Sequence, residues 1–170
     1  MNILCVSRYF KGADFLTAIK EQGHTAYLIT SSKLDKEPWP WDAIEETFYM
    51  VEDEEGSWNM PDLINGLAYT MRRIKFDIMV SLDDFDVEAT AHLREYFRIN
   101  GMGETTARYF RDKLAMRIKA KSEGIPVPDF TSLFHDEDIH NFTSTIDAPW
   151  ILKPRGQASA TGMSKVHTKD

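Results

Sequence analysis

The opening of the chain constrains its fold most, because two hydrophobic periods alternate there within about thirty residues. Residues 2–7 form a short apolar run that predicts a buried strand. Residues 14–21 have the spacing of a helix that ends near Gly23, and residues 25–30 predict a second strand. A β-α-β order of this kind indicates a parallel sheet with crossover helices, so we expect an α/β fold.

The turn between the first strand and the first helix argues against a dinucleotide-binding enzyme. It reads Ser-Arg-Tyr-Phe-Lys-Gly over residues 7–12. A Rossmann dinucleotide site needs Gly-x-Gly-x-x-Gly at this position, because glycines let the backbone approach the pyrophosphate closely. We therefore expect a Rossmann-like parallel sheet without a dinucleotide site.

The α/β pattern continues to about residue 100 and then changes. The further elements expected in this part are strands at 47–51 and 76–82 and helices at 60–74 and 86–97. The run Asn-Gly-Met-Gly at residues 100–103 then predicts a domain boundary. We therefore divide the chain into a parallel-sheet domain, residues 1–100, and a second domain, residues 101–170.

The second domain is expected to follow an α+β order. Its predicted elements are a helix at 105–122, a strand at 130–134, a helix at 135–142 and a strand at 149–153. A Gly-Ile-Pro-Val-Pro connector at residues 124–128 separates the first helix from the strand at 130–134. It should be stiff and extended, because each proline fixes its own φ and restricts the residue before it.

Three acidic residues, Asp83, Asp84 and Asp86, come directly after the strand expected at 76–82. Ligands of open α/β sheets gather beyond the carboxyl ends of the strands, so these carboxylates are candidates for contacts on the substrate side. Aspartate is also a common N-cap, and capping of the next helix by Asp84 or Asp86 is the more frequent role. Both interpretations stay open at this point.

The stretch at residues 150–166 carries the strongest chemical signal. A short apolar strand delivers Lys153 at its end, a loop of small residues comes next at 156–162, and a returning strand is expected after the loop. Small residues let backbone N–H groups approach an anion, and lysine adds positive charge, so this loop is suited to hold a phosphate. It is not a Walker A loop, since no lysine comes directly after its last glycine. A plain β-hairpin explains the same spacing equally well.

Composition excludes several classes of protein. The net charge of −7 disfavours non-specific nucleic-acid binding. There is no run of about 18 apolar residues and no basic-then-apolar leader, so we expect no membrane span and no signal peptide. The single cysteine, Cys5, rules out an intramolecular disulfide and fits the reducing cytoplasm. The histidines are scattered without zinc-type spacing, so we expect no zinc site.

Residues 101–166 together resemble the start of an ATP-grasp domain, as found in the biotin carboxylase-like carboxylate–amine ligases. The matching pieces are Gly101-x-Gly103, then Arg111-Asp112-Lys113 on a helix, the proline connector at 124–128, Ile151-Leu152-Lys153-Pro154, and the small-residue loop that ends at Gly162-Met163. Lys113 and Lys153 lie 40 residues apart, which is close to the family's spacing for its two nucleotide-binding lysines. Residues 1–100 look like the Rossmann-like domain that usually precedes ATP-grasp, which makes 101–170 an incomplete α+β first lobe.

The resemblance implies ATP binding. Lys113 and Lys153 would hold the α- and β-phosphates, a task that suits point charges with rotatable donors. The backbone of the loop would close over the β- and γ-phosphates, and its residues are Gly156, Gln157, Ala158, Ser159, Ala160, Thr161 and Gly162. Ile151 and Met163, which flank the loop, would contact adenine, although ordinary core positions explain them nearly as well. Arg155 has no firm equivalent in the family.

The implied chemistry has two steps. ATP phosphorylates a small carboxylate to an acyl-phosphate, and an amine then displaces the phosphate, normally with Mg²⁺ bridging the phosphates. The family's Mg²⁺ ligands come well after the loop, beyond residue 170, so the resemblance implies an N-terminal fragment of a longer enzyme. We expect this fragment to have no catalytic residue, no metal ligand and no ligase activity.

The expected partners are the small carboxylate and amine substrates, with room for a homodimer, and the expected location is the cytoplasm. The alternative from another class is a non-catalytic α/β module that binds a small ligand or a partner near residues 83–88.

Overall fold

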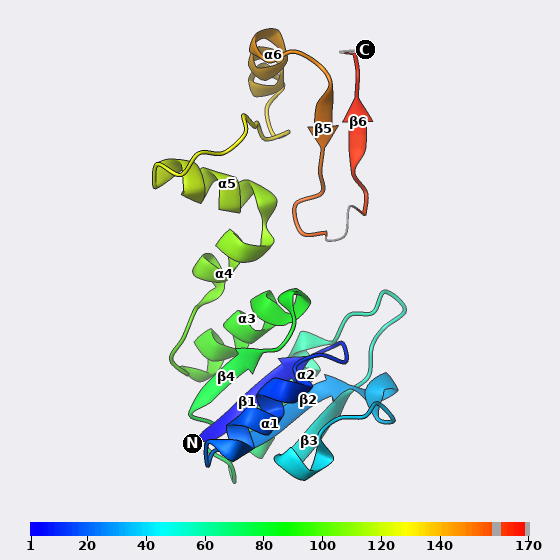
Figure 1. Ribbon diagram of the computed structural model, residues 1–170, viewed down its shortest axis with the longest axis vertical. Helices are drawn as coiled ribbons and strands as arrows, with labels where there is room; N and C mark the ends of the chain where they lie inside the picture. The colour runs from blue at the N-terminus through cyan, green and yellow to red at the C-terminus, as the bar shows by residue number, and fades with distance from the viewer. Residues whose placement is uncertain (158–160, 169–170) are drawn as a thin grey trace. The chain divides into compact units, whose positions relative to one another are not determined.

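The computed structural model describes residues 1–157 and 161–168 (Figure 1). The chain divides into two compact units, Met1–Ala107 and Arg108–Asp170, and each has its own architecture. The division falls inside helix α4 (Glu104–Arg111), a few residues after the glycine-rich run at which the sequence predicted a boundary.

The first unit is built on a four-stranded sheet in the order β3-β2-β1-β4. Its strands are β1 (Asn2–Ser7), β2 (Thr25–Ser31), β3 (Ile44–Met50) and β4 (Ile78–Ser81). All neighbours are parallel, and Leu4 of β1 lies opposite Tyr27 on one side and Met79 on the other. The parallel sheet predicted from the β-α-β opening is therefore confirmed.

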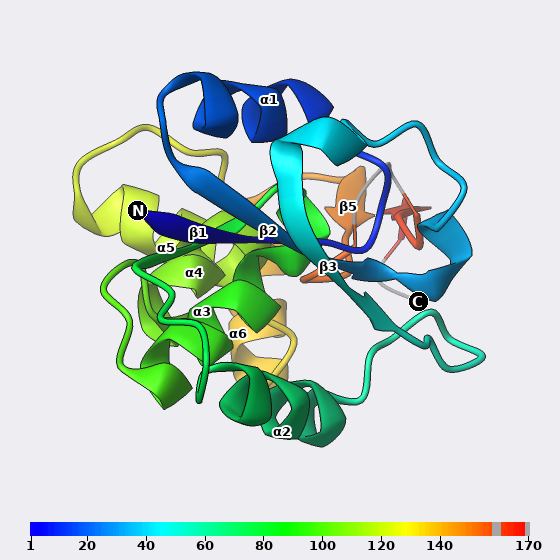
Figure 2. The same cartoon turned by 90° about the horizontal axis from the view of Figure 1, so that it is seen from below.

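Helices cover both faces of this sheet. They are α1 (Ala13–Glu21), α2 (Met60–Thr70) and α3 (Val87–Phe97). Figure 2 shows α1 on one face of the sheet and α2 and α3 on the other. Because the residues of a strand alternate between its two faces, β1 supplies both layers: Leu4 and Val6 pack with α2 and α3, whereas Ile3 and Cys5 pack with α1.

Burial has a chemical effect on the only cysteine of the chain. Cys5 is fully buried, and this burial raises the pKa of its thiol to about 12. The thiol is thus a packing group of the sheet, because a thiolate in that apolar layer would lose its hydration.

Short 3₁₀ helices fill the connections of the first unit. They are η1 (Ser32–Leu34), η2 (Trp41–Ala43) and η3 (Asp84–Asp86). Between the first two, Trp39 packs edge-on against Phe10 with ring centroids 4.8 Å apart, and its indole Nε1 donates to the Leu34 carbonyl over 3.1 Å. This tryptophan closes the α1 side of the sheet.

Three predicted elements of the first unit differ clearly in their bounds from the structure. The strand expected at 47–51 is β3, which begins three residues earlier, at Ile44. The helix expected at 60–74 ends at Thr70, because residues 71–73 form a turn in which the N–H of Arg73 bonds back to the Thr70 carbonyl. The strand expected at 76–82 is β4, which is shorter, since Phe76 packs in the core beside Tyr27 before the strand pairing begins.

The second unit contains α5 (Lys113–Ser122), α6 (Asp136–Thr145) and a two-stranded hairpin. The hairpin strands are β5 (Trp150–Leu152) and β6 (Ser164–Val166), which are antiparallel with Ile151 opposite Lys165. The returning strand expected after the loop is therefore confirmed.

Two predictions for the second unit are wrong. The single helix expected at 105–122 is two helices, α4 and α5, because Asp112 adopts an extended conformation between them and caps the second one. The strand expected at 130–134 is irregular, since no described strand pairs with it. Within the described residues, no helix is long and apolar enough to cross a membrane.

Gly12 fixes the turn from β1 into α1. Its φ is +81°, and a Cβ at this position would lie 2.9 Å from the Cβ of Leu82. Leu82 cannot retreat easily, because its own N–H bonds to the Val6 carbonyl at the end of β1. The turn therefore requires glycine for both its backbone conformation and its space.

Replacing Gly12 with alanine should lower the free energy of unfolding by more than the same change at Gly23. Gly23 also has a positive φ, +74°, but no atom within 4 Å of the added Cβ. Gly23→Ala should therefore cost only left-handed strain, about 1–2 kcal/mol. Gly12→Ala should cost about 1–3 kcal/mol more from overpacking. Urea unfolding followed by circular dichroism measures both, and equal costs would contradict the contact with Leu82.

Candidate functional site

The loop between β5 and β6, residues 153–163 and called the β5–β6 loop below, is held at its start by the junction of α4 and α5. The Arg111 Nη2 donates to the Gly156 carbonyl over 2.8 Å. The backbone N–H of Lys113 donates to the Arg155 carbonyl over 3.0 Å. The Lys113 ammonium donates to the carbonyl of Gln157 and lies 3.5 Å from that of Arg155. The α4–α5 junction thus holds three consecutive residues of the loop.

A carboxylate at the centre of this junction ties the two segments together. Asp112 accepts from the Arg155 guanidinium through both oxygens, with Nε 3.0 Å from Oδ1. The same Oδ1 accepts from the backbone N–H groups of Leu114 and Ala115 over 2.9 and 3.3 Å, which caps α5. The Arg155 guanidinium also lies over the Phe134 ring, 5.7 Å from its centroid.

The charges of this pair shift both pKa values in the direction that favours the ion pair. Hydrogen bonding to Arg155 holds the pKa of Asp112 below its ordinary value, although burial works against this, and the N–H groups of the cap lower it further. The Asp112 carboxylate in turn raises the pKa of the Arg155 guanidinium. Both groups are therefore charged at neutral pH.

The two lysines expected at the phosphates have different surroundings. Lys113 is half-buried in the first turn of α5, and its ammonium rests on loop carbonyls. Lys153 is exposed directly after β5. Both lie in the second unit, at the two segments that the contacts of the β5–β6 loop bring together.

The far end of the β5–β6 loop turns at Gly162. Its φ is +69°, and a Cβ there would lie 2.8 Å from the Cγ of Pro154. The two ends of the loop approach each other at this point, and both Thr161 and Gly162 are exposed. Ala158, Ser159 and Ala160, which were expected at the phosphates, lie outside the described residues.

The two apolar residues that flank the loop lie on the surface of the described structure. Ile151 is 57% exposed and Met163 is 38% exposed. Neither residue belongs to a core cluster of the described residues, and their contact with adenine stays a prediction. Both are exposed apolar side chains at the two ends of the β5–β6 loop.

The carboxylates after β4 face inward, in the first unit. Asp86 is fully buried, and its two oxygens bind the Nε of Arg8 at 2.7 Å and the Arg8 backbone N–H at 2.8 Å. Asp83 accepts from the Phe85 N–H at 2.9 Å and pairs with the Lys11 ammonium at 2.7 Å. Asp83 caps η3 with its side chain, whereas Asp86 occupies the N-cap position of α3 without a side-chain cap bond.

Burial and ion pairing both shift pKa values in this cluster. It raises the pKa of the Asp86 carboxyl, while the hydrogen bonds and the charge of Arg8 work in the other direction. The carboxylate of Asp83 raises the pKa of the Lys11 ammonium. Asp83 and Asp86 therefore hold cations of the same unit, and Asp84 is the exposed member of the three.

Sequence reasoning missed Asp112 and Arg155 as structural members of the site. The signal for Asp112 was an aspartate in the middle of a predicted helix, a residue that favours caps over helix interiors. No local signal identifies Arg155, since its partner is 43 residues away. Among the described residues, no group of three or more His, Cys, Asp or Glu side chains could hold a metal ion.

No model of a known protein family matches the chain. An L-arginine-specific L-amino acid ligase of Bacillus subtilis is 39% identical over 95 residues, which is 56% of this chain and 23% of that relative. The matched stretch thus spans less than a quarter of the relative's length.

Solved structures share the fold over nearly the whole chain. An L-amino acid ligase from Bacillus licheniformis matches with a TM-score of 0.73 and 20% identity, covering 99% of this chain and 38% of that one. The biotin carboxylase domain dimer of the Hydrogenobacter thermophilus 2-oxoglutarate carboxylase, in complex with MgADP, ADP and bicarbonate, matches with a TM-score of 0.71 and 17% identity. It covers 96% of this chain and 37% of that one.

Two replacements of Asp112 should separate its two roles. Asp112→Asn keeps an N-cap oxygen and removes the ion pair, which should cost about 1 kcal/mol of unfolding free energy at pH 7, since Arg155 is largely exposed. Asp112→Ala also removes the cap, at a further cost of about 1 kcal/mol. Urea unfolding of both variants measures these differences.

The cost of Asp112→Asn should depend on pH. The folded-state pKa of Asp112 lies below the ordinary 3.8, so its contribution is fully present above that value. It should be lost as the pH falls through the folded-state pKa, where wild type and Asp112→Asn become equally stable. A difference that stays constant down to acid pH would contradict the ion pair.

Proposed function

We propose that the chain forms the nucleotide-binding start of an ATP-dependent carboxylate–amine ligase. The premise is that it shares the fold of the N-terminal part of ATP-grasp ligases and part of its sequence with them. The observation that carries the proposal is the set of contacts between the α4–α5 junction and the β5–β6 loop. These contacts bring a lysine to a glycine-containing loop that begins with a second lysine, which is a setting for polyphosphate.

In this proposal Lys113 and Lys153 bind the α- and β-phosphates, and the backbone N–H groups at 156–162 cover the β- and γ-phosphates. The Lys113 ammonium already donates to loop carbonyls, so its charge lies where an anion would arrive. Exchanging a neutral carbonyl for a phosphate oxygen gives a stronger, charge-assisted hydrogen bond. Ile151 and Met163 would cover the adenine ring.

Arg155 acts in this scheme as a positioning residue. Its guanidinium is bound through two nitrogens to Asp112, so its charge is balanced before any nucleotide arrives. Its backbone carbonyl is bound by the N–H of Lys113. Arg155 thereby fixes the start of the β5–β6 loop relative to the first turn of α5.

The reaction transfers the γ-phosphoryl group of ATP to a carboxylate oxygen of a small molecule, which leaves ADP and an acyl-phosphate. The nitrogen of an amine then attacks the acyl carbon; a C–N bond forms, the C–O bond to phosphate breaks, and the amine loses a proton. Positioning and charge neutralisation would supply the rate enhancement. Mg²⁺ accompanies ADP in one structural neighbour. Among the described residues of this chain, no group of three or more His, Cys, Asp or Glu side chains could hold a metal ion.

The similarity to a ligase favours this function over a non-catalytic α/β module. The same proposal includes small carboxylate and amine substrates, a homodimer and a cytoplasmic location. It also includes the absence of turnover by residues 1–170 alone. The lone buried Cys5 is compatible with a reducing compartment.

Replacing either lysine with alanine should weaken ATP binding about tenfold or more, because each removes a charge-assisted contact to phosphate. Binding to residues 1–170 is expected to be weak, so NMR titration with ATP up to millimolar concentration is the suitable measurement. Lys121→Ala is the matched control, since Lys121 lies about 12 Å along α5 from Lys113. Unchanged binding in both Lys113→Ala and Lys153→Ala would remove the basis of the proposal.

Turnover is the second test. The enzyme in the length that its gene encodes should convert ATP to ADP only when a carboxylate and an amine are both supplied from a panel of amino acids and small acids. Lys153→Ala should abolish this conversion. ATP consumption that needs no acceptor, or that survives Lys153→Ala, would argue against the ligase.

A further inference from the structure

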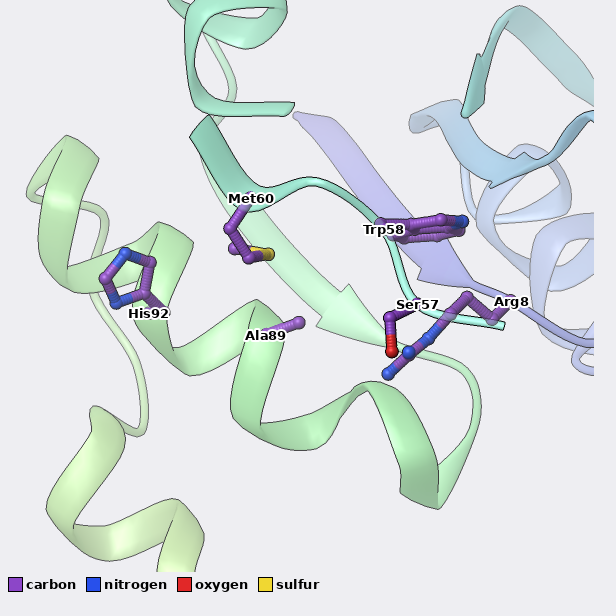
Figure 3. A pocket seen from close by; sticks show the side chains of 6 residues that line it. All are labelled: Arg8, Ser57, Trp58, Met60, Ala89 and His92. Atoms are coloured by element: carbon purple, nitrogen blue, oxygen red, sulfur yellow. The ribbon is translucent and has the colours of Figure 1, made fainter. Parts of the chain in front are cut away.

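The first unit contains a pocket that plays no part in the ATP site proposed above. Its volume is about 370 Å³, which is within the range of small-molecule sites, roughly 300–1,000 Å³. Three separate segments line it: the turn after β1, the segment that leads into the first residue of α2, and α3. The lining residues, shown in Figure 3, are Arg8, Ser57, Trp58, Met60, Ala89 and His92.

One end of the pocket is cationic. Arg8 and Asp86 form an ion pair, but their side chains are 22% and 0% exposed, so the carboxylate lies inside and the guanidinium reaches the pocket. Asp86 and the Phe85 carbonyl accept from the Nε and one Nη of Arg8. A guanidinium has five N–H donors, so this pairing leaves donors on its outer edge.

Neighbouring groups hold Arg8 in place and add a hydroxyl. The Trp58 ring lies beneath the guanidinium, with Cζ 5.6 Å from the ring centroid. In Figure 3 the guanidinium and the Ser57 hydroxyl point toward the same end of the pocket. A fixed guanidinium beside a hydroxyl is a suitable receptor for a carboxylate, since a planar fork matches its two oxygens.

Three carboxylates near the lining residues are paired with cations or with His92. Asp86 is behind Arg8, Glu52 pairs with the Lys33 ammonium at 2.7 Å, and Glu104 accepts from His92 Nδ1 at 2.7 Å. Arg8 is thus the charged side chain that the lining presents at this end of the pocket.

The rest of the pocket is apolar. The buried Trp58 ring, Met60 and Ala89 lie between the Arg8 end and His92 (Figure 3). The imidazole of His92 is held at the opposite end by Glu104. A molecule that fills the pocket therefore needs a charged head and an apolar body.

We propose that this pocket binds a small carboxylic acid with an apolar tail, its carboxylate on Arg8 and Ser57 and its tail between Trp58, Met60 and Ala89. The site uses no residue of the β5–β6 loop. Failure of this proposal therefore leaves ATP binding untouched, and failure of ATP binding leaves this pocket untouched.

The probe is 4-methylpentanoate, added to residues 1–170 and monitored by NMR at the indole N–H of Trp58. Comparison with Trp58→Phe assigns that signal. The signal should shift in a saturable way with 4-methylpentanoate. The uncharged 4-methylpentanamide should bind at least about tenfold more weakly, because it loses a charge-assisted hydrogen bond. Acetate, which has the head without the tail, should also bind at least about tenfold more weakly.

Filling the pocket should block binding. Ala89→Leu places a larger side chain into it from the surface of α3 and should weaken 4-methylpentanoate binding at least about tenfold. Ala18→Leu, the same change on the exposed side of α1, is the matched control and should bind like wild type. Ser57→Leu fills the pocket from an exposed position before α2. It replaces Ala89→Leu in the test if Ala89→Leu lowers the stability of the protein.

Two outcomes would overturn the proposal. The first is wild-type affinity in a folded Ala89→Leu or Ser57→Leu protein. The second is equal affinity for the acid and its amide. The indole signals of the other tryptophans, including Trp150 in the second unit, are internal references that should not move.

Discussion

The carboxylate of Asp112 is the contact on which the second unit depends. Asp112 lies between α4 and α5, and its carboxylate caps α5 and holds Arg155. A continuous helix would have bonded the N–H of Lys113 to the carbonyl four residues earlier. Because α5 begins at Lys113, the helix offers no partner for this N–H. The N–H donates to the Arg155 carbonyl instead. The break in the helix is thus what gives the β5–β6 loop its attachment.

In the first unit, cationic side chains cover two aspartates of an acidic stretch of sequence. Asp83 and Asp86 are almost completely buried, whereas their partners Lys11 and Arg8 reach outward. Long side chains keep their charged ends near water while short carboxylates stay beneath them. The acidic residues of this segment are thus divided: Asp83 and Asp86 lie beneath cations, while Asp84 and Glu88 are exposed.

The sheet could be predicted from sequence because its strands are apolar runs buried on both faces, as Ile3, Leu4, Cys5 and Val6 show. The α4–α5 break could not, since the helical period continues through Asp112 and its ion-pair partner lies far along the chain. Residues 130–134 have strand-like composition, but no strand of the described residues pairs with them, and composition alone does not supply a partner. The resemblance identified Lys113 and Lys153 as candidates for the site. The pairing of Asp112 with Arg155 is visible only in the structure.

The burial of Cys5 has a practical consequence for experiments on this chain. With its pKa at about 12 and its side chain inside the sheet, the only native thiol is protonated and screened from reagents in the folded protein. A cysteine introduced at an exposed position, such as Thr161 at the end of the β5–β6 loop, would carry a fluorophore or spin label without prior removal of Cys5. Because Cys5 stays unlabelled, the signal of the label reports only the motion of the site that carries it.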